Sequence, residues 1–433
     1  MKSKRLLAVF AVALAATGAP SGVRAQVQQD TCFRCHRIID EERYSRPVQE
    51  FQHDIHAQKG FGCVSCHGGN STLLGRAAKD PKWGYIGVPN RREIPELCGR
   101  CHSDPEFMKR YNPALRVDQV AEYRTSIHGQ RLFELGDPQV ATCTDCHTAH
   151  SIRPPNEPES SVHPLNVPQT CGRCHADPKH MAGYPIPTDQ LEEYRRSVHW
   201  QALSEGGDLS APACNDCHGN HGASPPEVTW VGNVCGQCHT AQADLFEVSA
   251  HRDAFIRLGT PGCAGCHGNH AVQSTSDQML GLGEGSVCAR CHTADDSGGI
   301  AALAMHGLID SLQGEMRSAD SLLVRAEVAG VEVSQAQFEL EDARNSLVRA
   351  RATTHSAAVD SVETQVQAGM EISLKAWTRG EEAFDELHFR RFGLAVSSVI
   401  ILFLIAGLVI RIREREERRA TEGKPEKWES RLR

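Results

Sequence analysis

The sequence has few aromatic residues, no excess of basic charge, and no cysteine outside one segment. Phe, Trp and Tyr make up 6% of the 433 residues, so few large side chains are available for a conventional core. The net charge of −8 argues against nucleic acid as a partner. The 18 cysteines are too sparse for a disulfide-dense secreted scaffold, and all of them lie between positions 32 and 292.

Long apolar runs are confined to the two ends of the chain. Basic residues at positions 2, 4 and 5 precede an apolar run over 6–16, and the small residues at 23–25 offer a cleavage site. This pattern predicts a secretory signal peptide over residues 1–25 rather than a short buried helix. The body of the protein is therefore expected outside the cytoplasm.

The apolar run near the C-terminus predicts a membrane anchor. Residues 393–410 carry no charge, and as a helix they span roughly 27 Å, close to the ~30 Å hydrocarbon core of a bilayer. We expect one transmembrane helix here rather than a buried helix of a soluble protein. Five arginines follow directly, so residues 411–433 are expected to form a cytoplasmic basic tail.

Every cysteine belongs to a C-x-x-C pair, and each of the nine pairs is followed at once by histidine. C-x-x-C-H is the attachment signature of c-type haem, in which two thiols bond the porphyrin and the adjacent histidine is the proximal iron ligand. The predicted thioether cysteines are Cys32, Cys35, Cys63, Cys66, Cys98, Cys101, Cys143, Cys146, Cys171, Cys174, Cys214, Cys217, Cys235, Cys238, Cys263, Cys266, Cys288 and Cys291. The predicted proximal ligands are His36, His67, His102, His147, His175, His218, His239, His267 and His292.

Three other readings of the cysteine pairs fit less well. Zinc sites use cysteine pairs but have no need of histidine at the next position. A disulfide across a two-residue gap closes a tight, strained ring, and dithiol redox motifs occur singly. The sequence therefore predicts nine covalently bound c-type haems.

The haem region is expected to cover residues 26–305, or roughly 30 residues per haem. So short a chain cannot surround each porphyrin with a conventional core, so the porphyrins must supply much of the buried apolar area. We predict a mostly α structure with much irregular chain: a haem-cored body, a helical stalk and one C-terminal transmembrane helix.

A longer repeat surrounds the motifs. The pattern aromatic-x-x-Ser/Asp-x-His occurs four times, 7 to 15 residues before a haem motif. Three of those motifs continue as C-x-x-C-H-x-x-H, whereas the first has Asn70 at the last position. The chain thus reads as one leading haem followed by four two-haem units. His306 resembles the start of a fifth unit that has no haem of its own.

The chain resembles the multihaem c-type cytochromes with doubled C-x-x-C-H motifs, a group that includes small tetrahaem cytochromes and quinol-oxidising periplasmic cytochromes. In such proteins the last histidine of C-x-x-C-H-x-x-H commonly binds the iron of a neighbouring haem, and the upstream histidine binds that of its own following haem. The resemblance implies bis-histidine haems, whose filled axial positions suit electron relay. The distal ligands that it implies are His56, His128, His150, His199, His221, His251, His270 and His306.

A ninth distal ligand remains to be assigned. His53 lies three residues before His56, and His355 lies at a break between two stalk helices. We choose His355, because a ligand there would fix the stalk to the haem body. Met108 and Met181 are expected to pack rather than to bind iron. Surface or structural roles are expected for His163, His180 and His388.

Residues 306–392 are expected to form a helical stalk. Apolar residues recur at three- and four-residue steps, with breaks near Gly330 and His355. The short breaks favour an antiparallel bundle, and a coiled-coil dimer is the alternative.

These features predict a membrane-anchored cytochrome on the periplasmic side of a bacterial inner membrane, with its C-terminus in the cytoplasm. It would relay single electrons between a quinol-linked or cytochrome donor in the membrane and a periplasmic redox acceptor. No catalytic residue is assigned, and a homo-oligomer is compatible with the sequence. The alternative is an oxidoreductase that acts on nitrite, hydroxylamine or a sulfur oxyanion, which would require a haem with an open distal position.

Overall fold

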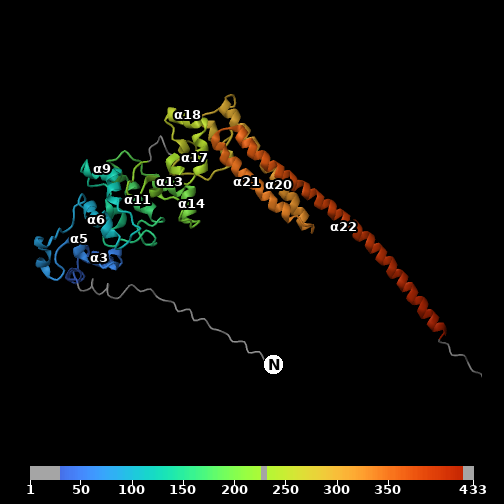
Figure 1. Cartoon of the computed structure of the whole chain (residues 1–433), viewed down its shortest axis with the longest axis horizontal. Coiled ribbons are helices and arrows are strands. Elements are labelled where there is room, and N and C mark those ends of the chain that lie inside the picture. Colours follow the sequence, from blue (N-terminus) through green and yellow to red (C-terminus); the bar gives the residue numbers. More distant parts are fainter. Residues whose placement is uncertain (1–29, 226–231, 423–433) are drawn as a thin grey trace, which may run out of the picture. The chain divides into compact units, whose positions relative to one another are not determined.

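The computed structural model describes residues 30–225 and 232–422, and it confirms a mostly α fold (Figure 1). Helices account for 64% of the chain, and no strand occurs in the two described ranges. The predicted signal peptide lies outside the described residues, as do the last eleven residues of the predicted tail. The chain forms two compact units. The first comprises Met1–Cys235 and Gly259–Ser274, and the second comprises Gly236–Leu258 and Thr275–Arg433.

The first unit consists of short helices joined by irregular chain. Its α-helices are α2 (Thr31–His36), α3 (Glu42–Phe51), α4 (Ile55–Gln58), α5 (Cys63–His67), α6 (Ile94–His102), α7 (Pro105–Met108), α8 (Gln119–Thr125), α9 (Ile127–Phe133), α10 (Cys143–His147), α11 (Val167–His175), α12 (Pro178–Met181), α13 (Gln190–Arg195), α14 (Val198–Ser204), α15 (Cys214–His218), α16 (Gly232–Cys235) and α19 (Gly262–His267). Two 3₁₀-helices, η1 (Gly75–Lys79) and η2 (Pro81–Trp83), follow α5. The helices α2, α5, α6, α10, α11, α15 and α19 each end at the histidine of a C-x-x-C-H motif.

Local signals start and stop the motif helices. At the start of α10 the Asp145 carboxylate accepts from the Thr142 backbone N–H at 2.6 Å, which satisfies one of the unpaired donors of a helix N-terminus. At the other end, Thr148 directly after the motif has φ 68°, a left-handed conformation that stops the helix. Gly219 and Gly268 occupy the same position in later units, with φ 87° and 75°. The motif at Cys143 is thus held as a single short helix with its histidine at the C-terminus.

The second unit contains the three longest helices of the described chain. Its elements are α17 (Thr240–Glu247), α18 (Ala250–Leu258), η4 (Asp277–Met279), η5 (Cys288–Arg290), α20 (Ser297–Val328), α21 (Ser334–Thr353), η6 (Thr354–Ser356) and α22 (Val359–Glu422). The breaks expected near Gly330 and His355 separate α20 from α21 and α21 from α22. The three helices pack lengthwise around one apolar core, as Figure 1 shows in orange and red.

The helix α22 continues without interruption from the stalk through the predicted transmembrane segment. Its apolar stretch is exposed, and the helix is long and apolar enough to cross a membrane. It is the membrane-anchor candidate of this chain. The bundle helix and the predicted transmembrane segment are therefore parts of one continuous helix of 64 residues.

Candidate functional site

Six pairs of histidine rings lie face to face or edge to face at nearly one distance. In each pair a motif histidine meets a histidine from outside the motifs. The ring centres are 5.9 Å apart for His56–His102, 6.1 Å for His67–His150, 6.1 Å for His128–His175, 6.1 Å for His147–His221, 6.0 Å for His218–His270 and 6.0 Å for His251–His292. The last pair lies in the second unit, and the other five lie in the first.

This spacing matches two imidazoles on opposite sides of one metal ion. A metal–imidazole nitrogen bond is about 2 Å long, and the ring centre lies roughly 1 Å behind the nitrogen, so two such rings have centres about 6 Å apart. The partners of each pair come from distant segments, as in His67 and His150. The six pairs therefore fit the axial positions of six haem irons.

The pairs form two geometric groups. Where the second histidine closes C-x-x-C-H-x-x-H, the two ring planes are nearly parallel, at 19°, 14° and 16°. Where the second histidine lies in the upstream repeat, the planes cross at 90°, 60° and 59°. The upstream histidine faces the second motif of its two-haem unit: His56 meets His102 and not the nearer His67. The resemblance to multihaem cytochromes had implied instead that it pairs with the motif that directly follows it.

The same kind of backbone hydrogen bond joins the segment of an upstream histidine to that of a C-x-x-C-H-x-x-H histidine in three places. The Ile55 N–H donates to the Ile152 carbonyl at 2.8 Å, one residue before His56 and two residues after His150. The same bond joins Ile127 to Ala223 at 3.1 Å and Val198 to Val272 at 2.8 Å. These bonds give neighbouring two-haem repeats the same register relative to each other. Sequence reasoning missed this bond, although the equal spacing from each histidine is visible in the repeat.

Burial lowers the pKa of several of the paired rings. It lowers the pKa of His147 to about 4, with the nearby His221 and His102 adding to the effect. Burial also lowers the pKa values of His102, His128 and His175. A neutral imidazole keeps a lone pair for a metal ion, so these rings are prepared for ligation at neutral pH.

Backbone carbonyls select the tautomer of several motif histidines. The Nδ1 atom of His67 lies 2.8 Å from the Gly87 carbonyl, and that of His218 lies 3.1 Å from the Ser224 carbonyl. A carbonyl can only accept, so Nδ1 carries the proton and Nε2 is left as the ligand atom.

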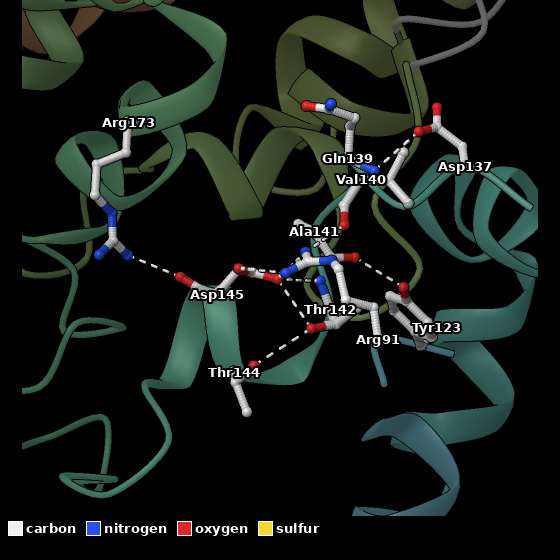
Figure 2. A network of polar contacts seen from close by, with 10 residues as sticks. All are labelled: Arg91, Tyr123, Asp137, Gln139, Val140, Ala141, Thr142, Thr144, Asp145 and Arg173. Atoms are coloured by element: carbon white, nitrogen blue, oxygen red, sulfur yellow. Dashed lines mark hydrogen bonds and ion pairs between the residues drawn. The ribbon is translucent and has the colours of Figure 1, made fainter. Parts of the chain in front are cut away.

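A polar network fixes the motif helix α10 in the first unit (Figure 2). Arg91 Nη2 donates to Asp145 Oδ2 at 2.5 Å and to the Val140 carbonyl at 2.6 Å, and Arg173 donates to the Asp145 carbonyl at 2.8 Å. Burial alone would raise the pKa of Asp145, but its hydrogen bonds, from Arg91 first, outweigh burial and lower it. The charged carboxylate is therefore stable between its partners and holds the helix that carries His147.

Cysteines of successive motifs are neighbours in space. In the first unit Cys98 and Cys143 lie close enough to shift each other's pKa, as do Cys171 and Cys214. The same is true of Cys235 and Cys263. None of the 18 cysteines, all of which lie in the described ranges, is in a disulfide, and thioether formation requires this. The residues present thus fit covalent haem at successive motifs.

The other predicted distal ligands lie on three different helices. His199 lies on α14, His306 on α20 and His355 on η6. His306 lines a cavity of about 210 Å³ in the second unit, together with Gly281, Leu282 and Leu303. His53 is exposed in the turn after α3. His36 lies edge-on to the Tyr44 ring, with the ring centres 5.8 Å apart.

Comparison with known proteins agrees with this chemistry. A family model described as Cytochrome c3 matches residues 55–176. The C-type polyheme cytochrome OmcC of Geobacter sulfurreducens is 24% identical over 242 residues, which make up 49% of this chain and 30% of that protein. The chain thus covers less than a third of this relative's length. No solved structure matches the chain.

The motifs and these two matches make the chain similar to multihaem c-type cytochromes. The same matches support covalent c-type haems on this chain.

Proposed function

We propose that this chain binds nine haems and relays single electrons along them, between a quinol-linked donor in the membrane and a periplasmic acceptor. The closeness of cysteines from three pairs of successive motifs supports this proposal, because it puts the third attachment site beside the fourth, the fifth beside the sixth and the seventh beside the eighth. A bound haem supplies an iron that changes oxidation state by one electron. The protein residues position the haems and fill both axial sites of their irons.

The six histidine pairs support relay over catalysis. With an imidazole on each side, an iron has no free position for a substrate and needs little rearrangement when it gains an electron. Residues such as Gly87 and Ser224 hold the rings through Nδ1, so that Nε2 faces the metal. His355 remains our choice for the ninth distal ligand over the exposed His53. Its Nδ1 lies 2.8 Å from the Ala352 carbonyl, the same arrangement as at His67.

The long helix supports a single-pass anchor with the haem body in the periplasm. Residues 393–410 would cross the bilayer, and Arg411, Arg413 and Arg415 would remain on the cytoplasmic side. Residues 306–392 would form the stalk between the haem region, 26–305, and this anchor. The relay would then end close to the donor in the membrane.

The leading motif supports a second candidate function. His36 has Tyr44 as its ring neighbour, and within residues 30–225 and 232–422 no second imidazole lies against it. An iron bound by His36 alone would have an open position. That haem could reduce or oxidise a small nitrogen or sulfur compound.

The test uses ligand substitution in the full-length holoprotein. His221→Ala should open one haem of nine, giving one high-spin signal and one equivalent of carbon monoxide binding in the reduced protein. His180→Ala is the matched control, because His180 stacks on Tyr184 instead of on another histidine. It should leave spin state and haem count unchanged.

Pyridine haemochrome should give nine haems per wild-type chain. A count of seven or fewer would contradict the proposal. One full equivalent of carbon monoxide bound by the wild type, together with turnover of nitrite or hydroxylamine, would favour the enzyme.

A further inference from the structure

One position of the repeat carries a charge in only one of the four units. The residue two before the upstream histidine is Asp54 in the first unit, and Ser126, Ser197 and Ser249 in the others. All four side chains are buried. Ser126 and Ser197 start the following helix, since their hydroxyls accept from backbone N–H groups at 2.9 and 3.1 Å. Asp54 also starts a helix, through the His56 N–H at 2.8 Å.

The carboxylate of Asp54 makes two further contacts that the serine hydroxyls do not make. Its Oδ1 lies 2.9 Å from Nδ1 of His56, and its Oδ2 accepts from the Ile152 N–H at 2.7 Å. The hydroxyls of Ser126 and Ser197 instead donate to backbone carbonyls three residues earlier, both at 2.6 Å. Asp54 is 0% exposed, and among the described residues its one ion-pair partner is His56. The negative charge therefore acts directly on the imidazole.

We propose that Asp54 is a positioning residue that lowers the reduction potential of the haem held between His56 and His102. A carboxylate that accepts from Nδ1–H makes the imidazole a stronger electron donor at Nε2. The extra donation and the buried negative charge both favour the ferric iron, which carries one more positive charge than the ferrous iron. This inference rests on the bis-histidine haems of the proposed function.

The charge reaches a second haem site. Ile152, which donates to Asp54, follows His150 by two residues, and His150 faces His67. The Asp54 charge also acts on the His150 ring and on the Cys66 thiol, as one of the smaller contributions to pKa values shifted mainly by burial. The reduction potential of the haem at the second motif should therefore be lowered too, but by less. The relay would then have a low-potential step at its second and third motifs.

The first test is Asp54→Ser, which gives the first unit the residue of its siblings. In a spectroelectrochemical titration of the full-length holoprotein, about one-ninth of the haem absorbance should shift strongly to higher potential, and a second ninth should shift in the same direction by less. We expect at least a tenfold change in that redox equilibrium, which is 59 mV for one electron. Asp80→Ser is the matched control: Asp80 also caps a short helix, through the Lys82 N–H at 3.0 Å, and contacts no imidazole. It should leave the titration unchanged.

The reciprocal variant is Ser126→Asp, which should lower the potential of the haem between His128 and His175. Ser126→Asp tests the effect of the carboxylate on the haem potential even if the buried Asp54→Ser variant fails to fold. Haem count and low-spin signals of the same samples test the proposed function separately. With nine low-spin haems retained, unchanged potentials in Asp54→Ser would overturn the role of Asp54. Unchanged potentials in a folded Ser126→Asp would do the same.

Discussion

The first unit and the α20–α22 bundle use different means to hold a chain together. The apolar core of the bundle contains 18 buried residues, 16 from three long helices and two, Val331 and Val333, from the connection between α20 and α21. In the first unit two separate apolar clusters contain four and three buried residues. The first unit is held instead by polar contacts such as Arg91–Asp145 and by backbone hydrogen bonds between its successive two-haem repeats. The bundle is an ordinary hydrophobic fold, whereas the described part of the first unit has only small apolar clusters.

The difference shows what the porphyrins must contribute. Burial of apolar area is the main favourable term in folding, and the seven residues of the two small clusters supply little of it. The paired histidines are spaced for a metal that the chain itself does not provide. Haem attachment and folding should therefore be one process in the first unit and separate processes in the bundle.

Withholding haem should give the largest difference in folding between the first unit and the bundle. If the chain is exported in cells that lack the attachment machinery, the first unit should lose its fold entirely, while α20 and α21 stay helical. Hydrogen exchange read by peptide would show it. Peptides from 119–218 should exchange as unfolded chain, and those from 309–350 should stay protected. The holoprotein is the control, and protection of 119–218 without haem would contradict the prediction.

A core truncation in the bundle should have the next largest effect. Leu323 is fully buried, so Leu323→Ala should cost about 2–5 kcal/mol in unfolding free energy. Phe338→Ala on α21 is the matched control, because Phe338 is 71% exposed and should change stability by less than about 0.5 kcal/mol. Urea unfolding followed by hydrogen exchange of α20 measures both. The haem spectrum should not change in either variant, and a spectral change in Leu323→Ala would show that the two regions are coupled.

Much of this arrangement could be predicted from the sequence, because the haem motif is local. Two thiols and one imidazole lie within five residues, and the helices that end at His147 or His218 follow from that spacing. The breaks of the bundle were also visible in the apolar periodicity.

The partner of each histidine could not be predicted in the same way. His56 meets His102 across 46 positions, and the choice depends on how neighbouring units pack. The Arg91–Asp145 contact is likewise a product of tertiary structure, since 54 positions separate the two residues. Asp54 was visible as an exception in the repeat, but its contact with Nδ1 of His56 was not.

The smallest expected effect concerns an ion pair that supports the bundle from within its own unit. Arg351 on α21 donates through Nε and Nη2 to the two oxygens of Asp277, at 2.8 and 2.7 Å. This contact is the largest cause that lowers the pKa of Asp277 below its ordinary value of 3.8. Arg351 is partly exposed to solvent, which weakens the pair. Asp277→Asn should therefore cost only about 1 kcal/mol at pH 7.

The pH dependence of that cost identifies its source. A carboxylate whose pKa is lowered on folding stabilises the protein above its unfolded pKa, and the stabilisation is lost as the pH falls through the folded pKa. The difference between wild type and Asp277→Asn should therefore be constant from pH 7 to about pH 5 and should shrink below about pH 4. Hydrogen exchange of α21 at each pH measures it. A difference as large at pH 3 as at pH 7 would mean that shape and not charge makes the contact, and that the bundle depends on apolar packing alone.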